Sequence, residues 1–306
     1  TQSKVEKEIS KKEGKNRHHL GREEFLRRVE QFAKESHDTI VNQTKRLGAS
    51  CDWSREAFTL DETSSLAVRT LFKMMYDDGL IYRGNRVINW DPKGQTTIAD
   101  DEIVYEEREA TLYTFNYSKD FPIAIASTRP ETKVGDTAVA VHPDDERYKQ
   151  YVGKTYEIKD FAGVPLTIKV VSDPSVEKEF GTGALGVTPA HAAIDWEIAQ
   201  KNNFPSKQVI SEFAKMTEAA GPLLAGKKAV EARALVAQWL KDNGLLIKEE
   251  KIKQNIATAE RTGGVIEPLP KLQWFVAVDK EFNRAGIKTT LKQLMRKPVE
   301  SGEINI

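Results

Sequence analysis

The stretch that decides the fold is GTGALGVTPAHAAIDWEIAQKNNFP, residues 181–205, which changes character three times. It begins with Gly181 and Gly183, a flexible turn whose bare backbone can approach a ligand closely. Residues 184–188 form a short, largely apolar run that predicts a buried strand. A helix is then expected to open at Pro189, a residue that suits the first helical turn.

The predicted helix brings two polar side chains to its start. Its buried face is predicted from the helical spacing of Ala192, Trp196 and Ala199. Asp195 falls in the first turn, four residues after His191, so the two side chains can share one side. Two interpretations stay open: Asp195 complements the helix dipole while His191 is a satisfied cap, or the pair binds a small charged group.

The same stretch spells GxGxxG through Gly181, Gly183 and Gly186. A dinucleotide site requires a strand directly before this motif and a helix directly after it. Here the polar segment SDPSVEKEF (172–180) precedes it and the strand-like LGVTPA (185–190) overlaps its end. The dinucleotide interpretation is therefore rejected.

Composition narrows the class of protein. The 306 residues carry 46 basic and 46 acidic side chains, which argues against a dedicated nonspecific nucleic-acid binder but permits a local basic patch. No apolar run reaches the length of a membrane span, and the single Cys51 fits a reducing compartment. We therefore expect a cytoplasmic protein with no metal site. Residues 1–20 are expected to form a charge-rich, frayed or solvated arm.

The remaining pattern predicts an α+β chain. Helices are expected at 21–47, 61–79, 192–203, 227–243 and 279–295. Asp61 stands where an N-cap belongs, and Gly48 and Gly79 are natural helix stops. Between about 104 and 171 the chain is a series of short strand-like runs with turns between them. That spacing predicts a β-barrel or a sandwich.

A second polar segment, STRPETKVGDTAVAVHP (127–143), directly follows one of these strands. Its hydroxyl groups, from Thr128, Thr132 and a neighbouring serine, can both donate and accept hydrogen bonds. Arg129 offers a planar fork suited to phosphate or carboxylate. The alternative is an ordinary turn of threonine and serine residues with Arg129 in a surface ion pair.

Residues 127–143 and 181–205 resemble the editing region of class I aminoacyl-tRNA synthetases, and the sequence TPAH (188–191) is closest to the valyl-tRNA synthetases. LGASCDWSR (47–55), GLIYRGNRVINWDP (79–92) and IEPLPKLQWFV (266–276) are similar to the segments that flank the inserted editing domain, in the same order. The resemblance runs from about residue 20 to the end. It implies a helical flank from the synthetase body (1–104), a β-barrel-like editing domain (105–250) and a return segment with a helix (251–306).

The resemblance also implies roles for individual side chains. Asp195 would hold the ammonium group of the substrate, and the threonine-rich turn would surround the ester and the terminal adenosine. The implied catalytic residues are Asp195, Thr128, Thr132 and Thr188. The implied substrate-binding residues are Arg129, Asp136, Gly181, Gly183 and His191. No nucleophile motif is present, so direct attack by a positioned water is expected, with assistance from the ribose hydroxyl of the tRNA.

The implied function is post-transfer editing, the hydrolysis of Thr-tRNA(Val). A pocket made for valine cannot strongly exclude threonine, a limit for which valyl enzymes are themselves the known example. The implied partners are the threonine-bearing 3′ end of tRNA(Val) and the remainder of the synthetase, with no membrane. The synthesis signatures HIGH and KMSKS are absent, so this segment is expected to need no cofactor, whereas a full-length synthetase uses ATP and Mg²⁺. Isoleucyl or leucyl editing and a noncatalytic tRNA-binding module are the alternatives.

Three positions depart from the valyl pattern. Gly186 stands where lysine is usual, Ala192 where aspartate is usual, and Lys133 where an apolar residue is common. A missing cation and a missing carboxylate at the site predict weak deacylase activity. We expect Gly186→Lys combined with Ala192→Asp to raise it at least tenfold, which is about 1.4 kcal/mol in barrier.

Overall fold

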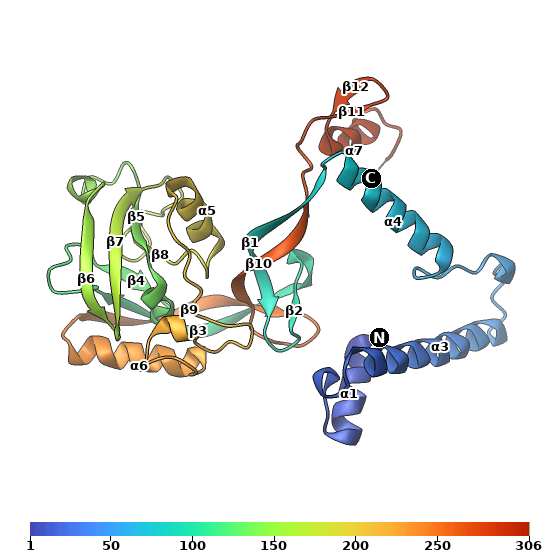
Figure 1. Cartoon of the computed structure of the whole chain (residues 1–306), viewed down its shortest axis with the longest axis horizontal. Coiled ribbons are helices and arrows are strands. Elements are labelled where there is room, and N and C mark those ends of the chain that lie inside the picture. Colours follow the sequence, from blue (N-terminus) through green and yellow to red (C-terminus); the bar gives the residue numbers. More distant parts are fainter. Residues whose placement is uncertain (306) are drawn as a thin grey trace. The chain divides into compact units, whose positions relative to one another are not determined.

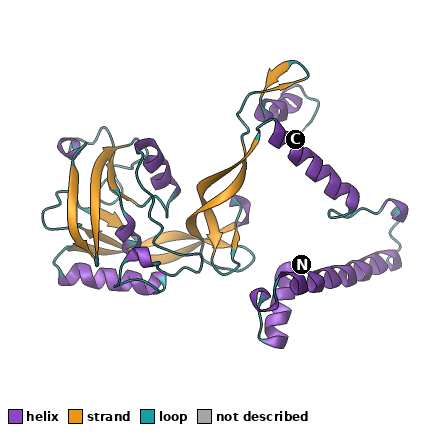
Figure 2. Ribbon diagram, in the orientation of Figure 1, coloured by secondary structure: helices purple, strands orange, loops and turns teal. Residues whose placement is uncertain are grey.

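The computed structural model describes residues 1–305, which divide into two compact units, one of residues 1–78 and one that begins at Gly79. Helices make up the first unit, and the second contains both helices and sheets (Figures 1 and 2). The chain is therefore a mixed α+β protein, as predicted. The division into three segments that the sequence suggested stays a prediction.

The first unit is built from α-helices and one 3-10 turn. They are α1 (Gln2–Glu13), α2 (Arg17–Leu20), α3 (Arg22–Arg46), η1 (Trp53–Arg55) and α4 (Glu62–Asp77). Residues 1–20 are largely helical and not frayed, because Val5 and Ile9 lie one turn apart on α1 and are buried against Phe25 of α3, whereas most of the other side chains are exposed, as expected of a solvated arm. Asp61 caps α4 as predicted, accepting a hydrogen bond from the Ser64 amide at 2.7 Å.

The second unit carries all the strands of the described residues. They are β1 (Ile81–Asp91), β2 (Thr96–Thr97), β3 (Ile103–Phe115), β4 (Ile125–Ser127), β5 (Ala138–Val141), β6 (Thr155–Phe161), β7 (Val164–Ser172), β8 (Ala184–Val187), β9 (Leu246–Ala259), β10 (Glu267–Val276), β11 (Phe282–Arg284) and β12 (Ile287–Thr289). Its helical segments are η2 (Asp100–Glu102), η3 (Pro130–Gly135), η4 (Lys149–Tyr151), α5 (Ala193–Asn202), η5 (Glu218–Ala220), α6 (Ala229–Asp242) and α7 (Leu291–Glu300).

The strands form four separate sheets. Their orders are β6-β7-β5-β8, β4-β3-β9, β10-β1-β2 and β11-β12. Within the described residues each order has two open ends, so the barrel-like closure expected from the sequence is not confirmed. Strand spacing indicates where strands occur, but it does not determine whether the first and last strands pair.

The sheet β6-β7-β5-β8 is covered on both faces, and β5 shows how the sequence permits this. In its AVAV run, Val139 and Val141 join the large core shared with β3, β4 and α6. Ala138 and Ala140 point the other way into a smaller cluster with Ile198 of α5. Because side chains alternate along a strand, one run of four buried residues supplies two cores.

The C-terminal part departs from the sequence prediction of one helix over 279–295. Residues 282–289 instead form the β11–β12 hairpin, and α7 begins only at Leu291. The two residues of the hairpin loop, Ala285 and Gly286, have φ angles of 50° and 83°. Positive φ at both central positions is the requirement of a tight two-residue hairpin turn, which a helical pattern does not reveal.

Candidate functional site

Three segments converge at the candidate site: η3 directly after β4, the end of β8, and the start of α5. The turn into η3 is set locally, because the Arg129 amide donates to Ser127 Oγ at 3.0 Å. Pro130 then occupies the first position of η3, where a missing N–H costs nothing. Every residue of η3 is buried. A polar segment held inside the protein must find its partners there.

A buried cluster centred on Asp136 supplies those partners, and we call Asp136, Tyr117, Lys133 and Thr188 the polar centre. The Asp136 carboxylate accepts hydrogen bonds from the hydroxyls of Tyr117 and Thr188. The Lys133 ammonium lies 3.5 Å from Asp136 and donates to the Gly186 carbonyl at 2.6 Å and to Thr188 Oγ1 at 2.8 Å. A lysine at a position usually apolar is therefore an interior cation with three acceptors around it.

The charges of the polar centre interact strongly because water is excluded. Burial raises the pKa of Asp136, and the Lys133 charge opposes this rise. Burial and the neighbouring Asp136 carboxylate raise the pKa of the Tyr117 hydroxyl well above its usual value. Tyr117 is therefore a neutral donor, and Lys133 with Asp136 is a buried ion pair whose hydrogen bonds offset part of its desolvation.

Asp195 lies beside the polar centre in the first turn of α5. One carboxylate oxygen accepts a hydrogen bond from the Thr188 amide at 2.7 Å, and the side chain is buried. Among residues 1–305 no hydrogen bond to its other oxygen is found. Burial raises the pKa of Asp195 to about 6, while the Lys133 charge opposes the rise. Asp195 is therefore largely ionised at neutral pH, and an added cation would relieve its desolvation.

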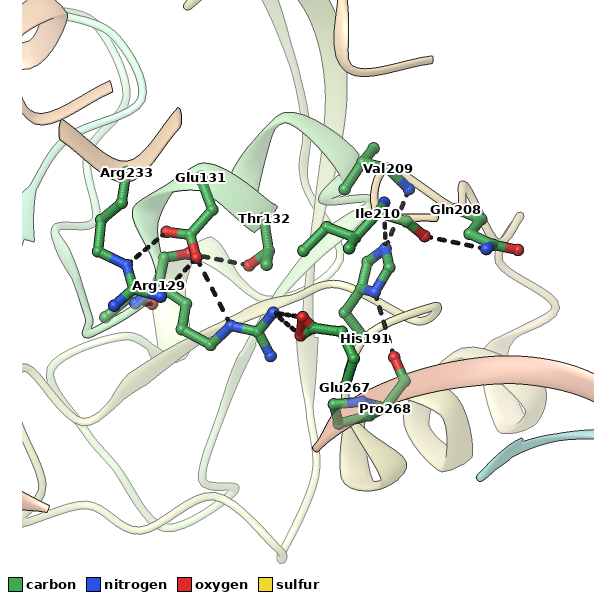
Figure 3. A network of polar contacts seen from close by, with 11 residues as sticks. Arg129, Glu131, Thr132, His191, Gln208, Val209, Ile210, Arg233, Glu267 and Pro268 are labelled. Carbon is green, nitrogen blue, oxygen red and sulfur yellow. Dashed lines mark hydrogen bonds and ion pairs between the residues drawn. The ribbon is translucent and has the colours of Figure 1, made fainter. Parts of the chain in front are cut away.

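Both ring nitrogens of His191 contact backbone groups of the protein. Its Nε2 accepts from the Val209 amide at 2.9 Å and the Ile210 amide at 3.2 Å, and its Nδ1 lies 3.3 Å from the Pro268 carbonyl (Figure 3). These partners require a neutral ring with the proton on Nδ1. Burial lowers the pKa of His191 to about 3, consistent with that tautomer. The ring joins three segments and has no nitrogen left for a ligand.

Arg129 belongs to a second set of charges, the η3 ion network, which comprises Arg129, Glu131, Arg233 and Glu267 (Figure 3). Arg129 pairs with Glu267 of β10 and lies 3.7 Å from Glu131. Arg233 of α6 donates two hydrogen bonds, of 3.0 and 2.8 Å, to the Glu131 carboxylate. The Thr132 hydroxyl donates to the Arg129 carbonyl at 2.9 Å, closing the turn. Arg129 is therefore ion-paired, as the structural alternative predicted, but its partners are buried carboxylates and the pair does not lie at the surface.

The other predicted residues lie at different distances from these groups. Thr128 is half-buried at the end of β4, next to Arg129. Gly181 lies against β4, because a Cβ there would be 2.6 Å from the Ala126 Cβ. Gly183 packs instead against Arg147, which belongs to neither the polar centre nor the ion network. The structure thus joins Asp195, Thr188 and Asp136 in one cluster and Arg129 with Thr132 in another.

Several residues of these clusters were missed from the sequence. Tyr117, Glu131, Arg233 and Glu267 have partners 19 to 138 residues away. Two signals could have indicated them: Glu131 stands inside the STRPET word, and Glu267 inside the flanking word IEPLP. Charged residues in otherwise apolar, buried segments are expected to be paired.

Other features of the described residues lie elsewhere. A cavity of about 600 Å³ is formed by β11, β12 and α7, and its lining includes no residue of either cluster. In the part of the chain that the structure describes, no three His, Cys, Asp or Glu side chains are arranged to hold a metal ion. Among the same residues, no helix is long and apolar enough to cross a membrane. The candidate site therefore consists of the polar centre with Asp195 and of the η3 ion network.

Comparison with known proteins identifies the family to which the chain belongs. A family model described as tRNA synthetases class I (I, L, M and V) matches residues 1–303. The valine–tRNA ligase of Protochlamydia amoebophila is 42% identical over 313 residues, covering 100% of this chain and 31% of that protein. The enzyme of Carboxydothermus hydrogenoformans is 46% identical over 279 residues, covering 90% of this chain and 31% of that protein.

The chain spans about a third of the length of the curated relatives it matches. Among solved structures, a LeuRS of Agrobacterium radiobacter K84 in a ternary complex with tRNA and LeuAMS aligns with 91% of this chain and 45% of its own. Its sequence identity is 17% and its TM-score is 0.29. The family match over nearly every residue is the decisive finding: the chain belongs to the class I tRNA synthetases of the I, L, M and V group.

Proposed function

We propose that this chain is the editing segment of a valyl-tRNA synthetase and that it hydrolyses Thr-tRNA(Val) after transfer. The observation that carries the proposal is Asp195, a buried carboxylate with one oxygen fixed by the Thr188 amide and the other without a donor among the described residues. An anion held in this way is suited to the free ammonium group of an aminoacyl ester.

The hydroxyl groups of three threonine residues support recognition of a threonine substrate. Thr128 stands on the turn that follows β4, Thr132 lies in η3, and Thr188 directly follows β8. Hydroxyls of this kind can pair with the threonine hydroxyl, whereas a valine side chain would leave them desolvated and unpaired. Thr128 is the most available of the three, because Thr132 and Thr188 already bond within the protein.

The chemistry that fits these side chains is direct attack by water. His191 cannot act as a general base, because both ring nitrogens are engaged and its pKa is lowered to about 3. Cys51 is exposed in the other compact unit. Water therefore adds to the ester carbonyl, the ribose hydroxyl of the tRNA leaves with a proton, and free threonine and tRNA result. This reaction needs no cofactor.

The tRNA end is the proposed partner, with the remainder of a synthetase around it. Arg129 has the right fork for a phosphate, but its guanidinium is paired with Glu267. Binding of a phosphate by Arg129 would therefore require exchange of one anion for another. ATP and Mg²⁺ would serve only the aminoacylation reaction of a full-length enzyme, which we place in the cytoplasm.

A single-turnover deacylation assay tests the proposal. Radiolabelled Thr-tRNA(Val), Val-tRNA(Val) and Ile-tRNA(Ile) are each mixed with excess protein, and the remaining ester is followed with time. We expect hydrolysis of the threonyl ester well above the uncatalysed rate and much slower loss of the other two. Rapid loss of the isoleucyl ester would favour a different editing specificity. Binding of tRNA without any hydrolysis would establish a noncatalytic binding module instead.

A further inference from the structure

Lys133 and Gly186 are 53 residues apart in the sequence, and both depart from the valyl pattern. In the structure they touch: the Lys133 ammonium donates to the Gly186 carbonyl at 2.6 Å. The side chain of Lys133 is buried, with an exposed fraction of 6%, and enters from η3. Lys133 therefore places a cation inside the protein beside Gly186, where the backbone carries no side chain.

The space around Gly186 explains why its lack of a side chain matters. A Cβ at this position would lie 2.5 Å from Asp136 Oδ2, 2.5 Å from the Tyr117 hydroxyl and 2.9 Å from Ile125 Cδ1. Real Cβ atoms do not approach other atoms so closely, so the polar centre would have to rearrange. A side chain at position 186 would therefore require the ends of the Asp136, Tyr117 and Ile125 side chains to shift, and in this chain the local cation comes from position 133.

Within residues 1–305, one positive group acts on the pKa of Asp195. Lys133 on η3 is the cation that lowers the pKa of Asp195, and Asp136, at the end of η3, raises it. Tyr117, which follows β3, is a neutral hydroxyl close enough for the Asp195 charge to raise the tyrosine pKa. His191, before α5, is neutral because burial lowers its pKa to about 3.

We propose that Lys133 is a positioning residue of the deacylation site, whose ammonium fixes Thr188 and the Gly186 carbonyl and keeps Asp195 anionic for the substrate ammonium. This inference rests on the proposed function. Lys133 does not need to touch the substrate, because its acceptors are all protein groups. Its effect reaches Asp195 through Thr188, whose hydroxyl accepts from Lys133 and whose amide donates to Asp195.

The test is a titration of the Asp195 carboxyl carbon by ¹³C NMR, in wild type and in Lys133→Met. The signal is assigned by its disappearance in Asp195→Asn. Methionine fills a similar volume without the charge. We expect the titration midpoint, about 6 in the wild type, to rise by at least one pH unit in Lys133→Met. In single turnover at pH 5, below both midpoints, a one-unit rise lowers the ionised fraction of Asp195 about tenfold, so deacylation of Thr-tRNA(Val) should fall about tenfold and its pH profile should shift upward by the same amount.

Two control variants separate positioning from folding. Lys207→Met removes a lysine near the other side of η3, whose ammonium lies 3.4 Å from the Val134 carbonyl, and it should change neither the midpoint nor the rate. Lys133→Met with Asp136→Asn removes both buried charges. This double variant should recover the wild-type melting temperature while the Asp195 midpoint stays raised. If the melting temperature and the Asp195 midpoint both return to their wild-type values, Lys133 is a purely structural residue. A double variant that does not fold would lead to the same conclusion.

Failure of this inference differs from failure of the proposed function. A wild type that hydrolyses no aminoacyl ester would refute the function, while the NMR midpoint would still report on Lys133. An unchanged Asp195 midpoint in folded Lys133→Met, or an equal effect of Lys207→Met, would overturn the positioning role even if the wild type is an active deacylase.

Discussion

Replacement of Asp195 by asparagine should stabilise the protein while weakening its binding of substrate. The carboxyl has a reference pKa of 3.8 and a pKa of about 6 in the folded protein. Because the pKa is raised on folding, its favourable contribution is complete below pH 3.8 and is lost as pH rises through about 6. At about 1.4 kcal/mol for each pH unit, the ionised group costs about 3 kcal/mol at neutral pH.

Asparagine removes this cost and retains an oxygen for the Thr188 amide. The free energy of unfolding of Asp195→Asn should match that of wild type near pH 3.5 and exceed it by up to about 3 kcal/mol above pH 7. Urea unfolding followed by tryptophan fluorescence at a series of pH values measures the difference. Both proteins would carry Trp53→Phe, so that the signal comes from the second unit. Glu197→Gln, an exposed change on the same helix, is the control.

The same substitution should weaken binding of a threonyl-adenosine ester analogue. A hydrogen bond to a charged group contributes about 1.5–3 kcal/mol, so the dissociation constant should rise by one to two orders of magnitude. A difference in stability that is the same at pH 4 and pH 8 would refute the pKa argument. Unchanged affinity for the analogue would mean that Asp195 only complements the helix dipole.

Four further outcomes are expected. The chain as given should show no valine-dependent pyrophosphate exchange above a no-enzyme control, because HIGH and KMSKS are absent; measurable exchange would mean that ATP is bound elsewhere. Gly186→Lys, alone or with Ala192→Asp, should lower the free energy of unfolding by about 1–3 kcal/mol and reduce activity, contrary to the expectation from sequence, because a Cβ at position 186 forces the buried ends of the Asp136, Tyr117 and Ile125 side chains to shift; a tenfold gain in rate would restore that expectation. Affinity for tRNA should fall with added salt along a shallow slope, since few phosphates are contacted, and no salt dependence would argue against Arg129 as a contact. Glu267→Gln should free Arg129 and raise tRNA affinity several-fold in a filter-binding assay; weaker binding would show that the pair positions Arg129 for the tRNA.

The sequence by itself determined the local elements. The series of short strand-like runs up to residue 171 predicted several strands, and β7 (Val164–Ser172) is one of them. Asp61 and Gly79 marked the two ends of α4 because capping depends on residues only a few positions apart. The family words were also readable, since they are runs of neighbouring residues. The buried face of α5 was predicted only in part, because Asp195 and Ile198 are buried with Ala199, whereas Trp196 is half-buried.

Tertiary structure decided which polar groups meet. Local patterns give no partner for a side chain, so the sequence left His191 and Arg129 with two interpretations each. The distant partners that decide between them are Val209 and Pro268 for His191 and Glu267 for Arg129, which lie 18 to 138 residues away. The contact between Lys133 and Gly186 has the same character, because it requires η3 and β8 to be brought together by the shared core. Lys133 and Gly186, which the sequence shows only as two separate departures, are in contact in the structure, since a buried charge and the space for it are fixed only when the chain is folded.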